Sequence, residues 1–142
     1  MSTILIVDDD SKVARSILRM LEGNAVAIET HAPTAVARIM NTEWPGEYFD
    51  VVVCDVGMPN MSGLDVLQAI LSRREPPIFI LMSGDEDSIF GVLGADGVLA
   101  KPFQGSELRQ LIATLRKERS RAKTQRLRRP MLEATSANLC SE

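Results

Sequence analysis

The sequence predicts an α/β protein in which a parallel sheet carries helices on both faces. Short runs of apolar, β-branched residues alternate with segments whose apolar residues recur at helical spacing. This alternation occurs five times along the chain, and βα repeats build parallel strands through right-handed crossovers. Several apolar runs end directly at polar or charged residues, and the carboxyl ends of parallel strands meet at one edge of a sheet. We therefore expect a doubly wound five-stranded sheet with polar side chains gathered at that edge.

Size and composition are those of one globular domain with a well-formed core. The chain has 142 residues, of which 45% are hydrophobic and 25% are charged. No run approaches the roughly 18 apolar residues of a membrane span, and the first residues enter a strand pattern instead of a signal peptide. These features predict a cytoplasmic protein with no membrane partner. Cys54 and Cys140 lack the spacing of a disulfide framework or a metal site, so we expect two free thiols.

Charge divides the chain near Leu115. Residues 1 to 115 contain 16 acidic and 8 basic residues, whereas residues 116 to 142 contain 8 basic and 3 acidic residues. The apolar stripe of the last predicted helix thins at the same point, which favours a solvated linker helix beyond it. Contact of this basic stretch with nucleic acid or another anionic surface stays open, although it lacks interleaved aromatic residues.

The first strand ends in acidic residues. Thr3 to Val7 is an apolar, β-branched run, and a helix with apolar residues at helical spacing follows it. Asp10 or Ser11 is placed to cap that helix. A cap uses one of three consecutive acids, so local structure leaves Asp8 and Asp9 unexplained.

The third strand also ends in an acid. Between the two lie a weaker strand over residues 25 to 30 and a helix that has Pro33 in its first turn. Val51 to Cys54 then reads as a strand buried on both faces, and it stops at Asp55 before a run of loop-forming residues. Asp55 is a candidate nucleophile or metal ligand, and a strand-ending turn residue is the simpler alternative.

The remaining strands end at polar residues too. The expected elements are a helix over residues 64 to 71 ended by Pro76 and Pro77, a strand over 78 to 82 that ends at Ser83, a short helix over 85 to 93, a strand over 97 to 100 that ends at Lys101, and a helix over 108 to 115.

Together these strand ends predict a site for Mg²⁺ and a phosphoryl group. Asp8, Asp9 and Asp55 would repel one another at one sheet edge unless a cation lies among them, and Mg²⁺ prefers oxygen ligands. Mg²⁺ leaves coordination positions for phosphate oxygens. Lys101 can neutralise phosphoryl charge, the Ser83 hydroxyl can donate a hydrogen bond, and Asp55 can attack phosphorus.

These residues resemble the receiver domain of two-component response regulators. The resemblance rests on Asp8-Asp9, on Asp55 in the segment DVGMP with Gly63 beyond it, on Ser83-Gly84 and on Lys101-Pro102-Phe103. It covers about residues 3 to 118, so we expect a receiver domain over 1–118 and a basic linker or tail over 119–142. It implies a flavodoxin-like sheet of order 2-1-3-4-5.

The resemblance also implies a function in a phosphorelay. Asp55 would accept a phosphoryl group from a sensor histidine kinase or a phosphotransfer protein, and Ser83 and Lys101 would bind that group. Asp8, Asp9, Asp55 and the backbone carbonyl of Gly57 would hold Mg²⁺. The chain would be a signalling domain and not an enzyme beyond its own phosphorylation and dephosphorylation. An output domain that follows this chain and a homodimer are both compatible with it, and nucleic acid would be reached through that domain or, less readily, through the basic tail.

Two positions depart from the family's pattern. Val98 stands three residues before Lys101, where members usually carry Tyr or Phe, and the stretch from Ser83 to Lys101 is about one helical turn short. We expect intact phosphorylation chemistry, with output through another surface or through dimer rearrangement. Gly57 and Asp85 flank the expected site and influence phosphate lifetime, with a sign that the sequence does not give.

Other functions fit less well. A flavin-binding protein of this fold would need Ser, Thr and Gly after the first strand, and an Asp-nucleophile phosphohydrolase would need a second acid where Gly57 stands. No GxxxxGK[ST] loop is present. The main alternative is a degenerate receiver that binds partners constitutively, which retention of the five key positions argues against. His31 has no companions at ligand spacing, so we expect it at the surface or in the core.

Overall fold

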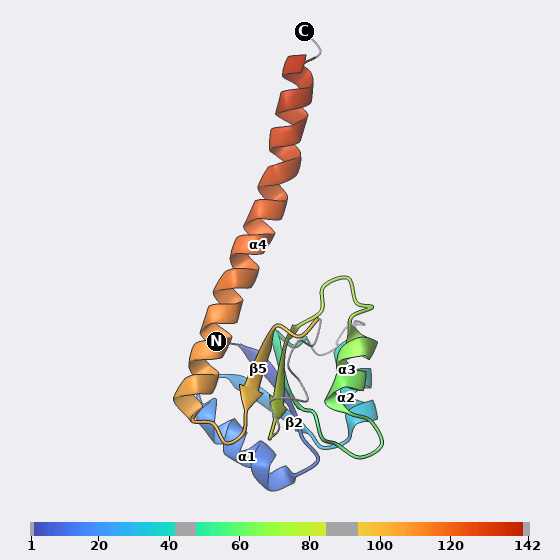
Figure 1. Ribbon diagram of the computed structural model, residues 1–142, viewed down its shortest axis with the longest axis vertical. Coiled ribbons are helices and arrows are strands. Elements are labelled where there is room, and N and C mark those ends of the chain that lie inside the picture. Colours follow the sequence, from blue (N-terminus) through green and yellow to red (C-terminus); the bar gives the residue numbers. More distant parts are fainter. Residues whose placement is uncertain (1, 42–47, 85–93, 141–142) are drawn as a thin grey trace.

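The computed structural model describes residues 2–41, 48–84 and 94–140, and it contains a five-stranded parallel sheet between layers of helices (Figure 1). The strand order is β2-β1-β3-β4-β5, which confirms the predicted flavodoxin-like topology. The elements are β1 (Thr3–Val7), α1 (Ser11–Met20), β2 (Ala25–Glu29), α2 (Ala32–Met40), β3 (Val51–Asp55), α3 (Gly63–Ile70), β4 (Ile78–Ser83), β5 (Gly97–Ala100) and α4 (Gly105–Cys140).

The helices cover both faces of the sheet. Helices α1 and α4 pack on one face and α2 and α3 on the other (Figure 1). Successive side chains of a strand point to opposite faces, so Ile4 and Ile6 of β1 enter the first core while Leu5 and Val7 enter the second. Every residue of β3 and β4 is buried, which explains why these strands read as continuous apolar runs.

Local signals fix most helix ends. Asp10 is the N-cap of α1, and its carboxylate accepts hydrogen bonds from the backbone N–H groups of Lys12 and Val13 at 2.9 and 3.4 Å. Pro33 lies in the first turn of α2, as predicted. The prediction that Pro76 and Pro77 end α3 was wrong, because that helix ends at Ile70. The proline pair instead leads directly into β4.

Helix α4 runs antiparallel to the strands and continues beyond the sheet (Figure 1). It begins near the carboxyl end of β5 and passes the amino edge of the sheet, where Arg116 donates a hydrogen bond to the hydroxyl of Ser2. One turn later Arg119 donates to the carbonyl of Pro76 at 2.6 Å. The helix predicted over 108 to 115 is therefore the packed part of a longer element. The short helix predicted over 85 to 93 lies outside the described residues.

Among the described helices, none is at once long enough and apolar enough to cross a membrane.

Gly63, the first residue of α3, allows the helix to start directly against the end of β3. A Cβ atom on Gly63 would collide with the backbone carbonyl oxygen of Asp55 and lie 3.0 Å from the carbonyl carbon of Asp55 and from the Cα of Val56. Backbone atoms cannot yield as the end of a flexible side chain can. The position of Asp55 therefore depends on a glycine eight residues later in the chain.

We predict that Gly63→Ala lowers the free energy of unfolding by about 1–3 kcal/mol through overpacking, measured by chemical denaturation. Gly84→Ala is the matched control, because no atom lies within 4 Å of its Cβ position. Equal stability of the two variants would show that this close contact does not constrain the fold.

Candidate functional site

Four strand ends converge at the carboxyl edge of the sheet. Strands β1 and β3 are neighbours, and the register that pairs Val7 with Cys54 brings the next residues, Asp8 and Asp55, side by side. At the other side of β3, the backbone N–H of Lys101 donates to the carbonyl of Ser83 at 2.8 Å, which joins the ends of β4 and β5. Parallel pairing therefore gathers the polar residues that the sequence places after separate strands.

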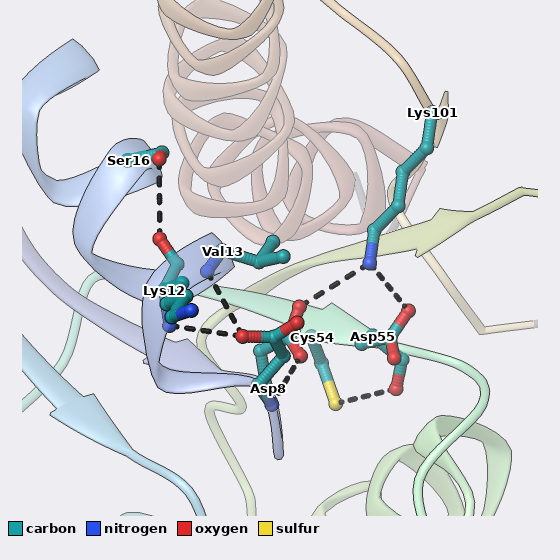
Figure 2. Close-up of polar contacts among 8 residues, drawn as sticks. Asp8, Lys12, Val13, Ser16, Cys54, Asp55 and Lys101 are labelled. Atoms are coloured by element: carbon teal, nitrogen blue, oxygen red, sulfur yellow. Dashed lines mark hydrogen bonds and ion pairs between the residues drawn. The ribbon is translucent and has the colours of Figure 1, made fainter.

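The side chain of Lys101 reaches back across this edge to two carboxylates (Figure 2). Its Nζ lies 3.0 Å from Oδ1 of Asp55 and 3.2 Å from Oδ2 of Asp8. The Asp8 side chain is 1% exposed and that of Asp55 is 12% exposed, so these are ion pairs in a largely dehydrated place. The ammonium offsets the repulsion between two carboxylates on adjacent strands.

A third carboxylate completes an acidic group that could hold a cation. One carboxylate oxygen from each of Asp8, Asp9 and Asp55 lies within 4.8 Å of the others. A backbone hydrogen bond of 2.9 Å from Asp10 N–H to Oδ1 of Asp8 orients the most buried member. Because the donors are all oxygens and Asp9 is exposed, the group fits a hard ion that keeps water or phosphate oxygens in its remaining positions.

Burial and neighbouring charges shift the pKa values of Asp8 and Lys101. Burial raises the pKa of the Asp8 carboxyl, although the hydrogen bond from Asp10 and the charge of Lys101 oppose the rise. Burial also works to lower the pKa of Lys101, but its hydrogen bond to Asp55 and the negative charges of Asp8 and Asp55 outweigh this and raise the pKa. Lys101 therefore carries a firmly held proton at the centre of the site.

Ser83 and Gly57, two further residues predicted for the site, lie at or just after the ends of strands at the same edge of the sheet. Ser83 is the last residue of β4 and is 6% exposed. Gly57 follows Asp55 by two residues and is exposed, with no atom within 4 Å of its Cβ position. Their predicted roles in phosphoryl and metal binding stay predictions.

The structure gives two residues supporting contacts that the sequence did not predict. Gly63, at the start of α3, packs on the backbone of Asp55, and a single glycine carries no sequence signal for that contact. Cys54 Sγ donates to the carbonyl of Asp55 at 3.4 Å, and burial raises the pKa of its thiol. Because the raised pKa keeps the buried thiol neutral, Cys54 acts as a packing residue of the hydrophobic core.

Other residues considered from the sequence lie away from this edge or outside the description. His31 is exposed at the N-cap of α2, where its Nδ1 lies 2.7 Å from Oγ1 of Thr34, so it takes the surface position, one of the two that were expected. Val98 of β5 is 44% exposed. Asp85 lies outside the described residues, as does the side chain of Cys140.

Comparison with known proteins agrees with this geometry. The family model described as the response regulator receiver domain matches residues 4–113. The cell cycle response regulators CtrA of Brucella ovis and Brucella canis are each 34% identical over 109 residues, which cover 74% of this chain and 46% of theirs. The chain thus spans about half the length of these relatives.

Solved structures with the same fold include full-length and single-domain regulators. A response regulator receiver domain protein from Clostridium thermocellum matches with a TM-score of 0.73 and 28% identity, covering 84% of this chain and 98% of that one. Full-length FixJ from B. japonicum matches with a TM-score of 0.74 and 27% sequence identity, and the match covers 87% of this chain and 61% of FixJ. TrrA from Thermotoga maritima, in complex with Mg(2+)-BeF, matches with a TM-score of 0.68 and 27% sequence identity. This match covers 81% of this chain and 99% of TrrA.

We predict that Lys101→Met lowers the free energy of unfolding without Mg²⁺ by about 1–3 kcal/mol, because it leaves the buried Asp8 without its cation. Added Mg²⁺ should stabilise the variant more than the parent, since the divalent ion no longer competes with an ammonium for the carboxylates. Chemical denaturation with and without Mg²⁺ measures both effects. Lys123→Met, at an exposed position of α4, is the control, and a Lys101 variant indistinguishable from it would contradict the prediction.

Proposed function

This chain belongs to the family of response regulator receiver domains, and from that membership we propose that it receives a phosphoryl group on Asp55 and acts as the switch of a phosphorelay. The observation that carries the proposal is the Lys101 ammonium, 3.0 Å from Asp55 and 3.2 Å from the buried Asp8 at the carboxyl edge of the sheet. A positive charge held beside a carboxylate at the edge of the sheet suits phosphoryl transfer.

In the proposed reaction a carboxylate oxygen of Asp55 attacks the phosphorus of a phosphohistidine. The new P–O bond forms as the P–N bond breaks, and the imidazole nitrogen keeps the electron pair. The donor is a sensor histidine kinase or a phosphotransfer protein. When bound, Mg²⁺ supplies positive charge that offsets the phosphoryl oxygens, with Asp8, Asp9, Asp55 and the Gly57 carbonyl as its proposed protein ligands.

Lys101 and Ser83 have the proposed task of holding the phosphoryl group after transfer. The ammonium now on Asp55 Oδ1 would turn to a phosphoryl oxygen, while the Ser83 hydroxyl would donate to another. The two residues are joined through the bond from Lys101 N–H to the Ser83 carbonyl. A change in either side chain therefore reaches the ends of both β4 and β5.

The remaining assignments follow from the same proposal. Residues 1–118 would form the receiver and 119–142 a basic linker or tail, in a cytoplasmic protein without enzymatic activity beyond its own phosphorylation and dephosphorylation. The chain spans about half the length of its CtrA relatives, and we infer that it controls an output domain or a partner protein, with a homodimer as a further proposed assembly. The alternative is a domain that binds partners constitutively, without phosphorylation. The ion pairs of Lys101 with Asp8 and Asp55 favour a domain that accepts a phosphoryl group.

Incubation with Mg²⁺ and a small phosphodonor, followed by intact mass, tests the proposal. We expect the parent chain to gain the mass of one phosphoryl group and Asp55→Asn to gain none, because the amide has no nucleophilic carboxylate oxygen. Glu22→Gln, at an exposed position after α1, should label like the parent. Labelling of Asp55→Asn to the same extent, or no labelling of the parent, would contradict the proposal.

We further propose that output bypasses the usual aromatic switch, because Val98 offers neither ring nor hydroxyl to rearrange. Hydrogen exchange of the phosphorylated chain against Asp55→Asn should show its main changes outside residues 85 to 110. A response centred on that range would show that the usual face transmits the signal despite Val98.

A further inference from the structure

Helix α4 carries a run of exposed basic side chains where it leaves the sheet. Residues 116 to 126 include six basic residues and one acidic residue, Glu118, and all of them are exposed. Residues 1 to 115 have twice as many acidic as basic residues. The positive charge of the molecule is therefore concentrated on this one helical stretch.

The basic stretch begins at the edge of the sheet opposite the acidic site. Arg116 contacts Ser2, which precedes β1, and Arg119 contacts Pro76, which precedes β4. Asp8 and Asp55 follow their strands at the other edge. Figure 1 shows α4 continuing away from the body beyond these contacts, so an anionic partner can approach the helix without meeting the acidic group of Asp8, Asp9 and Asp55.

Basic side chains project from opposite sides of this helix. An α-helix turns by about 100° per residue, so Lys117 and Arg121 share one side while Lys123 and Arg126 share the other. Lys123 and Arg126 lie on the side of Arg119 and line a hollow with Glu75 and Asp96 of the body, so Lys117 and Arg121 form the side that faces away from these acids. Lys117 and Arg121 are also like charges at i,i+4, which destabilises a helix in isolation. A partner with two rows of negative charge would neutralise both sides of the helix and remove this repulsion.

We propose that residues 116–126 of α4 bind the phosphate backbones of double-stranded nucleic acid without base specificity. An α-helix with its side chains is about 10–12 Å across, and the major groove of B-form DNA is about 12 Å wide with a phosphate backbone on each side. Ala122 is the single apolar residue of the stretch, so it has no apolar face to insert into a bilayer. It has no aromatic residue for stacking on single strands.

Fluorescence anisotropy of a labelled 20-base-pair DNA duplex with the full 142-residue chain tests the proposal. Each of the double variants Lys117→Gln/Arg121→Gln and Lys123→Gln/Arg126→Gln should weaken binding at about 100 mM salt by at least tenfold. Each should also make the dependence of log K on log salt shallower by about 2, one for each lost phosphate contact. Far-UV circular dichroism checks that the variants keep the fold.

Arg15→Gln/Arg19→Gln is the control, because it removes the same charge from exposed positions of α1. It should bind the duplex like the parent. Equal weakening in the control would assign the binding to net charge and overturn the proposal, as would no duplex binding at about 50 mM salt. Tighter binding to phosphatidylserine vesicles or to a single strand of the same length would also overturn it.

Discussion

The contact of the Lys101 ammonium with Asp8 and Asp55 is the constraint on which the rest of this molecule depends. Two carboxylates at the ends of adjacent buried strands destabilise the fold unless a cation lies between them, and here that cation comes from the end of β5, with Nζ–O distances of 3.0 and 3.2 Å. The observed strand order places β1 beside β3, and β5 close enough for Lys101 to reach both carboxylates. The stability of this edge and the proposed phosphoryl chemistry thus depend on the same three side chains.

Strand β5 connects the two edges of the sheet at which the proposed functions lie. Lys101 follows its carboxyl end, while Asp96 precedes its amino end and accepts a 2.8 Å hydrogen bond from the backbone N–H of Phe79 in β4. The same Asp96 oxygen lies 3.5 Å from the guanidinium of Arg119. A strand of four residues thus separates the candidate phosphorylation site from the point where α4 leaves the body.

Most of the fold could be predicted from the sequence because apolar runs and strand-ending polar residues report directly on burial. The same reasoning placed Asp8, Asp55 and Lys101 at one edge, whereas the strand order came from the family resemblance. The contact of Gly63 with the Asp55 backbone could not be predicted, because a glycine has no side chain that would contribute to a hydrophobic or polar pattern. The solvated helix predicted beyond Leu115 is confirmed, but its extension to Cys140 was not predicted, because a helix that is polar all round shows no apolar periodicity. The end of α3 was predicted wrongly at Pro76 and Pro77, because a helix can end several residues before a proline that would break it. Helix α3 ends at Ile70.

Paramagnetic broadening of amide NMR signals by Mn²⁺ tests most directly whether these side chains form one divalent-ion site. Mn²⁺ shares the preference of Mg²⁺ for oxygen ligands and can replace it. At substoichiometric Mn²⁺, the account predicts broadening centred on residues 8 to 10, 55 to 58 and 101, and its reversal by excess Mg²⁺. Broadening centred elsewhere, for example on Glu75 and Asp96 at the opposite edge of the sheet, or spread evenly over the acidic surface, would contradict it.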